Sequence, residues 1–266
     1  MLQLDRTSLP HPFPNTDTLP GSDNTPVDNE DQNFVPNVLL FVLEYLWRTR
    51  EDWHFGVDMA LYYLPDTGTA RAIVPDGFLS VGVKRPMTDE TRKSYFIWKE
   101  KVTPQFVLEH VSETKGGEYD DKLAIYQKLG VKYYAIFNPK FSQRDRHELL
   151  EIYRLEGDRY VLQPPEEPYW MPEIGLGLGR CTQTCDLRDR EVLCWFDEKG
   201  DRYLTQDERG EAEKQRADAE QERAERAEKN EQLARQQAAE ADQRAEVLAA
   251  KLRELGIEPA SFSADG

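Results

Sequence analysis

The sequence has few cysteines and no long apolar run. Cys181, Cys185 and Cys194 are its only cysteines, and they lie late in the 266 residues. Because no signal-peptide pattern opens the chain, we expect reduced thiols in a cytoplasmic protein. The CxxxC spacing, with no histidine nearby in the sequence, argues against a zinc site. No stretch approaches the ~20 apolar residues of a transmembrane helix, so no membrane association is expected.

Basic charge is also scarce. The chain has 34 Lys and Arg against 50 Asp and Glu, a net charge of −16. This disfavours a surface that binds polyanions along its whole extent. Residues 34–200 nevertheless hold 22 of the 34 basic side chains. A local basic groove in that segment therefore remains compatible with the composition.

Apolar periodicity is missing from both ends of the chain. Residues 1–33 are rich in Pro, Asp, Asn, Thr and Ser, which is typical of a disordered tail. We expect an α/β domain over 34–203, a coiled-coil-like helix over 204–257 and a disordered end over 258–266.

The middle segment alternates helical and strand patterns. A helical apolar period starts near Asn37, and "EYDDKLAIYQKLG" predicts a second, amphipathic helix. Strands are predicted for "FGVDMALYYL", "RAIVPDGFLSVGV", "QFVLEHV" and "VKYYAIFNP", and a hairpin for "ELLEIYRLEGDRYVLQ". The predicted order is helix, three strands, helix, strand, then further strands.

The segment after about Asp207 changes composition abruptly and has a heptad period. Ten of the twelve a and d positions are apolar, though seven of these are alanine: Ala217, Glu220, Ala224, Ala227, Glu231, Ala234, Ala238, Ala241, Ala245, Leu248, Leu252 and Leu255. The pattern predicts one helix over 207–255. It leaves open a homo-oligomer formed through this helix or a lone solvated helix.

Acids interrupt apolar strand patterns at Asp58, Asp76 and Glu109. Burying an unpaired carboxylate is costly, so such acids need a reason. Neighbouring strands lie about 4.8 Å apart, and acids on adjacent strands can share one cation. Carboxylate oxygens suit Mg²⁺ or Mn²⁺. We expect the carboxylates of Asp76 and Glu109 to lie close enough to bind one ion.

Three segments carry a family resemblance: "VPDGFLSV", "FVLEHVSETKGGEYDDKLAIYQKLGVKYYAIFNP" and "MPEIGLGLG". Together with the element order they resemble the PD-(D/E)XK restriction-endonuclease-like core and, more specifically, the Uma-two family. The resemblance covers roughly residues 37–200, and the helix closing in "AAKLRELGIEP" is similar to the end of one subgroup. It implies an endonuclease that uses Mg²⁺ or Mn²⁺ to hydrolyse phosphodiester bonds in DNA.

The resemblance also implies a set of site residues. Asp76 and Glu109 would be catalytic metal ligands, with the backbone carbonyl of His110 as a further ligand. Glu44, on the first helix, is a weaker candidate, and Asp58 is another.

The lysine of the nuclease motif is not where the pattern places it. The motif expects lysine at 111, where this chain has Val111. The resemblance implies that Lys122, on the following helix, supplies the ammonium instead, and Lys115 in the Gly-rich turn is the rival. We predict Lys122 because a helix holds a side chain more rigidly than a turn.

Simpler interpretations exist for each residue. Asp76 can cap a turn after Pro75, Asp58 can be a surface residue of an edge strand, and Lys122 can be a solvated helix lysine. The alternative function is a catalytically silent nuclease fold that acts as an interaction module through its coiled coil. The joint presence of Asp76, Glu109 and a lysine favours the enzyme.

Overall fold

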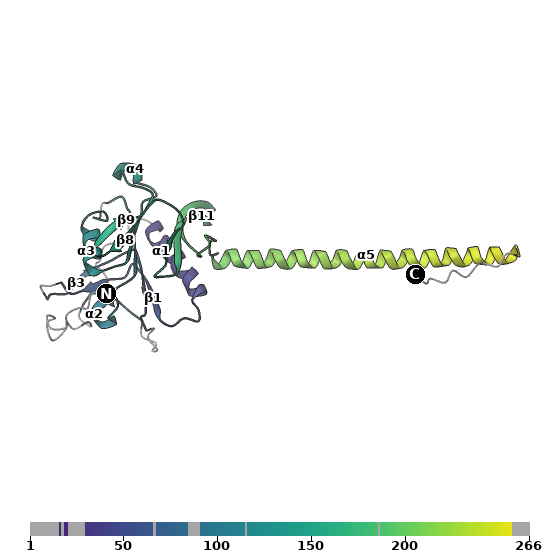
Figure 1. Cartoon of the computed structure of the whole chain (residues 1–266), viewed down its shortest axis with the longest axis horizontal. Helices are drawn as coiled ribbons and strands as arrows, with labels where there is room; N and C mark the ends of the chain where they lie inside the picture. The colour runs from purple at the N-terminus through teal and green to yellow at the C-terminus, as the bar shows by residue number, and fades with distance from the viewer. Residues whose placement is uncertain are drawn as a thin grey trace. The chain divides into compact units, whose positions relative to one another are not determined.

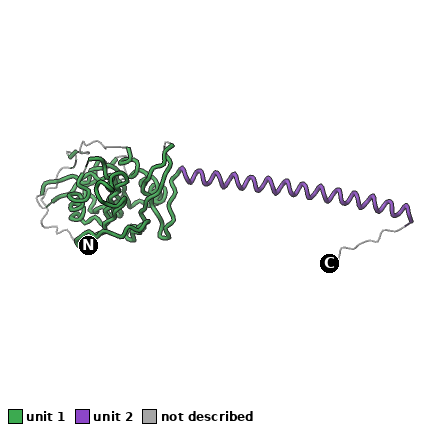
Figure 2. The backbone as a smooth tube through the Cα atoms, turned by 90° about the horizontal axis from the view of Figure 1, so that it is seen from above, with its two compact units in different colours: residues 1–206 green, residues 207–266 purple. Residues whose placement is uncertain are grey.

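The computed structural model describes residues 16, 19–20, 30–65, 68–84, 91–114, 116–185 and 187–256. The chain divides into two compact units, residues 1–206 and residues 207–266 (Figure 2). The first unit contains the sheets and all the candidate site residues.

A six-stranded mixed sheet forms the centre of the first unit, in the order β1-β4-β6-β7-β8-β9 (Figure 1). Its strands are β1 (Trp53–Val57), β4 (Gly77–Val81), β6 (Phe106–His110), β7 (Tyr133–Phe137), β8 (Leu150–Glu156) and β9 (Arg159–Leu162). Only β6 and β7 pair in parallel within this sheet. Every residue of these two strands is buried, as expected for the centre of a covered sheet.

Helix α3 (Asp121–Leu129) makes the crossover between β6 and β7. It ends at Gly130, whose backbone is in the left-handed conformation (φ 78°) that glycine adopts more easily than other residues. The amphipathic pattern predicted this helix, but its start is at Asp121, because residues 118–120 form turns instead.

Alternation along β6 divides its side chains between two apolar clusters. Phe106 and Leu108 belong to the cluster that includes α1 (Glu30–Leu46), whereas Val107 belongs to the cluster that includes α3. Since successive strand side chains point to opposite faces, Glu109 faces α3 and His110 faces the other side. The ring of His110 accordingly packs edge-on against Phe137, 5.4 Å between centroids.

Helix α1 starts seven residues before Asn37, near which the sequence pattern places the start of the helical period. Its first turns run through Glu30 and Asp31, and Pro36 lies inside the helix. Proline provides no N–H for the helical ladder. One residue later, the Asn37 side chain donates to the Asn33 carbonyl at 2.8 Å. The helical element therefore reaches into the segment that was expected to be a tail.

Two strand predictions joined elements that are separate in the structure. A second sheet has the order β3-β2-β5, with β2 (Leu61–Tyr63), β3 (Arg71–Ile73) and β5 (Tyr95–Phe96). The run "FGVDMALYYL" is broken at Asp58, whose φ is 46°, and "RAIVPDGFLSVGV" is broken at Pro75–Asp76. Short helices α2 (Ile97–Glu100) and α4 (Ser142–Asp145) follow β5 and β7 along the chain.

A third sheet, in the order β10-β11-β12, closes the first unit. Its strands are β10 (Tyr169–Met171), β11 (Leu176–Cys185) and β12 (Arg188–Phe196). Cys181 and Cys194 form a disulfide between β11 and β12, with Cα atoms 6.1 Å apart. The expectation of reduced thiols was therefore wrong for these two cysteines, because the strand pairing brings them side by side.

Helix α5 (Gln206–Glu254) accounts for the second unit. It has 49 residues and no buried side chain along its described length. Charged and polar residues surround it, as its composition predicts. Among the described residues, no helix is long and apolar enough to cross a membrane.

Candidate functional site

Asp76 lies one residue before β4, at the break that Pro75 introduces. Its backbone carbonyl accepts from the Asp58 N–H at 3.1 Å, which ties the end of β1 to the start of β4. Its carboxylate Oδ2 accepts from the His110 backbone N–H at 2.6 Å. The Asp76 side chain therefore reaches across to the end of β6, where Glu109 lies.

Glu109 is the most enclosed acid of the site, with 1% of its surface exposed. Its Oε2 accepts from Lys122 Nζ at 2.8 Å and its Oε1 from the Tyr126 hydroxyl at 2.6 Å. Lys122 and Tyr126 are four residues apart on α3 and so share one face of the helix. Helix α3 thus presents two donors to the two oxygens of one strand carboxylate.

The pKa values of both carboxyl groups are raised in the fold. Burial, followed by the charge of Glu109, raises the pKa of Asp76 well above its usual range. Burial also raises the pKa of Glu109, although the Lys122 ammonium opposes that rise. Two acids crowded in a dry setting favour either a shared proton or a cation.

Lys122 and Tyr126 respond to the same charges. Burial acts to lower the pKa of Lys122, but Glu109 and then Asp76 raise it overall, so the ammonium stays charged. Burial and the charge of Glu109 raise the pKa of Tyr126 well above its usual range, so its hydroxyl stays a donor. The site therefore contains two acids, one permanent cation and one neutral donor.

This donor set fits a hard divalent cation only in part. Within the described ranges, no three His, Cys, Asp or Glu side chains are arranged to hold a metal. Asp76 and Glu109 supply carboxylate oxygens from adjacent strands, and their mutual repulsion is what a cation relieves. Magnesium commonly keeps several waters and binds through one or two carboxylates, so two acids suffice for it.

Two of the other predicted residues are exposed, and the third lies outside the residues that the structure describes. Glu44 is exposed near the end of α1, eight residues after Pro36, the helix residue beside Gly77. Eight residues correspond to about 12 Å along a helix. Asp58 is exposed, and its backbone N–H contacts Asp76. Lys115 lies outside the residues that the structure describes.

Sequence reasoning missed two residues beside Glu109. Tyr126 was interpreted only as part of the apolar face of its helix, yet its hydroxyl binds Glu109. Glu118 is buried, and its charge adds to the rise in the pKa of Glu109. The spacing of four between Lys122 and Tyr126 was a usable signal, because it places both polar ends on one helix face.

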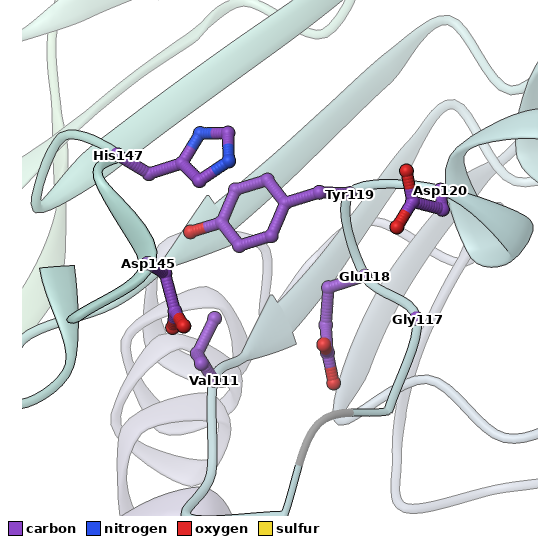
Figure 3. A pocket seen from close by; sticks show the side chains of 7 residues that line it. All are labelled: Val111, Gly117, Glu118, Tyr119, Asp120, Asp145 and His147. Atoms are coloured by element: carbon purple, nitrogen blue, oxygen red, sulfur yellow. The ribbon is translucent and has the colours of Figure 1, made fainter.

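A cavity of about 170 Å³ lies at the segment that joins β6 to α3 (Figure 3). Its lining residues are Val111, Gly117, Glu118, Tyr119, Asp120, Asp145 and His147. The rings of Tyr119 and His147 stack in it with centroids 3.6 Å apart. Glu118 lines the cavity, and its charge also raises the pKa of Glu109.

Comparison with known proteins places the chain among nuclease-like sequences. A search of curated proteins found no match. A crystal structure described as "a putative nuclease belonging to DUF820" from Anabaena variabilis ATCC 29413 is similar at 13% identity, with a TM-score of 0.38. That similarity covers 54% of this chain and 71% of the other. The Uma2 family, described as "Putative restriction endonuclease", matches residues 25–207, which is more than half of the chain. The chain belongs to the Uma2 family.

Proposed function

We propose that this protein is a metal-dependent endonuclease that hydrolyses phosphodiester bonds in DNA. The observation that carries the proposal is the pairing of the half-buried Asp76 with the buried Glu109 at the end of β6, with Lys122 Nζ 2.8 Å from Glu109. Family membership supports the reaction class, and the pair supports the need for a cation.

Asp76 and Glu109 would hold the ion, together with the backbone carbonyl of His110. Bound there, Mg²⁺ or Mn²⁺ would polarise a phosphoryl oxygen and make a bound water more acidic. The His110 N–H fixes the orientation of the Asp76 carboxylate, which leaves the other Asp76 oxygen for the ion. Glu109 is oriented by its two donors from α3.

Lys122 would act on the phosphate. Its side chain is 24% exposed, whereas that of Glu109 is 1% exposed, so the ammonium lies between the buried acid and the solvent. A cation in that place can stabilise charge that develops on phosphate oxygens during attack. It can also orient the attacking water by hydrogen bonding.

The test is incubation of the full chain with supercoiled plasmid, with Mg²⁺, with Mn²⁺ and with chelator alone. Cleavage that depends on the ion, and that Glu109→Gln abolishes, is expected. Lys122→Ala should also reduce cleavage. Lys128→Ala is its matched control, because Lys128 is an exposed lysine on the same helix. Cleavage unaffected by Glu109→Gln would contradict the assignment of the site.

A second candidate function is a silent nuclease fold that acts as an interaction module. The observation that favours it is α5, 49 residues with no buried side chain, which leaves its surface available to a partner. We also propose that α5 mediates a homo-oligomer through residues 207–255. Metal-independent DNA or partner binding without cleavage would favour this candidate over the enzyme.

A further inference from the structure

Tyr126 is enclosed more completely than the other donor to Glu109. Its side chain is fully buried, with its ring 4.9 Å from that of Tyr134. Its hydroxyl lies 2.6 Å from Glu109 Oε1. By contrast, Lys122 is a long side chain that is partly exposed to solvent. The two donors to Glu109 therefore differ in freedom: the tyrosine is fixed by packing and the lysine is not.

The bond from Tyr126 does not use up the oxygen that it contacts. A carboxylate oxygen has two lone-pair directions, so Oε1 can accept from a hydroxyl and still bind a cation. The hydroxyl also remains neutral at ordinary pH, so it adds no charge that would compete with the cation. Such a partner fixes a ligand without weakening it, as outer-shell hydrogen bonds do at metal centres.

We propose that Tyr126 is a positioning residue of the nuclease site: its hydroxyl fixes the Glu109 carboxylate in the orientation that binds the cation. The inference rests on the proposed function and deepens it. It also gives the two donors to Glu109 separate roles. Tyr126 keeps Glu109 in place, so Lys122 can turn toward the phosphate without releasing the carboxylate.

The chain offers a matched control for this role. Tyr134 is also fully buried, and its ring belongs to the same apolar cluster. Its hydroxyl donates to the backbone carbonyl of Glu118 at 2.8 Å rather than to a carboxylate of the site. Tyr126→Phe and Tyr134→Phe each remove one buried hydroxyl and keep the ring. They should cost similar stability, and they differ in whether Glu109 loses a donor.

The experiment measures Mn²⁺ binding by calorimetry in the absence of DNA, and plasmid cleavage separately. A hydrogen bond to a charged group is worth about 1.5–3 kcal/mol, which corresponds to about 10- to 150-fold. We expect Tyr126→Phe to weaken Mn²⁺ binding and to lower kcat by at least about 10-fold, with KM for DNA unchanged. Tyr134→Phe should bind Mn²⁺ and cleave as the unmodified chain does.

The two measurements separate this inference from the proposed function. If the unmodified chain binds Mn²⁺ without cutting DNA, the proposed function fails, and weaker Mn²⁺ binding by Tyr126→Phe alone still supports the positioning role. Equal effects of both substitutions would reduce Tyr126 to a structural residue and overturn the inference. Absence of Mn²⁺ binding by the unmodified chain would overturn it as well.

Discussion

Asp76 is an acid whose environment opposes its charge. Its pKa in the folded chain is raised above the unfolded value, chiefly by burial and then by Glu109. The folded state therefore binds more protons than the unfolded state once pH exceeds the unfolded value of 3.8. By linkage, the free energy of unfolding falls as pH rises from there toward the folded pKa. The charge of Asp76 therefore lowers the free energy of unfolding at neutral pH.

Asp76→Asn should therefore stabilise the ion-free protein at pH 7 to 8 and not at pH 3.5. The amide keeps an oxygen for the His110 N–H but has no charge to desolvate. For a domain of this size each kcal/mol regained raises Tm by about 2–4 °C. Thermal unfolding in chelator at both pH values is the measurement, and plasmid cleavage should be lost. An equal change of Tm at both pH values would mean that the Asp76 charge is not the cause.

His110 contributes to the site with its backbone and titrates with its side chain. Burial lowers the pKa of its imidazole to about 4, and the nearby charges of Asp31 and Lys140 act in opposite directions. The folded pKa lies below the unfolded value of 6.5, so stability is complete above pH 6.5 and declines as pH falls toward 4.

His110→Leu should flatten the pH dependence of stability between pH 4 and 6.5. Cleavage at pH 7.5 should stay within about threefold of the unmodified chain, because the backbone N–H and carbonyl remain. Thermal unfolding across this pH range tests the stability prediction, and a cleavage assay at pH 7.5 tests the activity prediction. A hundredfold loss of cleavage would show that the imidazole, not the backbone, acts at the site.

Lys122 remains the predicted catalytic lysine. Lys122→Ala should lower the cleavage rate by roughly 10²-fold or more while the fold is kept, because the ammonium stabilises phosphate charge. Lys115→Ala and Lys128→Ala are the comparisons, one in the Gly-rich turn and one elsewhere on α3. Inactive Lys115→Ala with active Lys122→Ala would move the role to the turn.

At the scale of elements, the sequence predicted the elements whose pattern is local. The helix around Lys122, strands β6 and β7, and the hairpin β8–β9 with its turn at Glu156–Asp158 were found from periodicity. The sequence also predicted the order helix, strands, helix, strand along the chain, although two of the predicted strands each divide into two. That Lys122 lies on the same side of the sheet as Glu109 was implied by the family resemblance.

Tertiary contacts decided the remaining features. The Tyr126–Glu109 hydrogen bond joins residues that are 17 apart in the sequence. No local sequence pattern shows that a tyrosine whose ring packs in the core uses its hydroxyl to bind a carboxylate. The Cys181–Cys194 disulfide follows from the β11–β12 register. The split at Asp58 needed a positive φ that a non-glycine residue rarely adopts. These features depend on partners that lie far away in the sequence.

The pairing of β1 with β4 gives a prediction at this scale. Gly56 lies opposite Phe78 in the register, and a Cβ at Gly56 would lie less than 3.0 Å from the Phe78 ring. Phe78 is fully buried and cannot move aside cheaply. Gly56→Ala should lower the free energy of unfolding by about 1–3 kcal/mol, as overpacking does.

Denaturant titration of the Gly56→Ala chain measures this. Gly210→Ala, in α5, gives a control with open space around the new Cβ and no positive φ. A Gly56→Ala chain as stable as the unmodified one would mean that Phe78 repacks and that the register tolerates a wider spacing.

At the scale of the whole molecule, α5 is the element that exposes apolar side chains at regular heptad positions. Its leucine end is exposed, with Leu248 at 65% and Leu255 at 74%, whereas its alanine positions offer little surface. Glu231 occupies a core heptad position but is neutralised by Arg235 at 2.6 Å within the same helix. A second copy of α5 is a partner that can cover the leucine end.

The charges of α5 favour a parallel pair. In the heptad frame with Ala217 at a, the charged g positions are all basic: Arg216, Arg223, Arg244 and Lys251. An antiparallel pair places g against g and so opposes like charges, whereas a parallel pair places Arg223 against Glu228 of the second helix. We therefore expect a parallel dimer that is weak, because only the last two heptads carry leucine at a or d positions.

Sedimentation of the full chain and of residues 1–205 tests the association, and a cysteine substitution tests its direction. The full chain should sediment as a dimer at high concentration and the shorter chain as a monomer.

Ala245→Cys should then cross-link to itself under oxidation, since parallel in-register helices bring equal a positions together. The unmodified chain is the control, because it carries three native cysteines. A monomeric full chain would leave α5 a solvated helix, and a dimer that Ala245→Cys fails to cross-link would reverse the predicted direction.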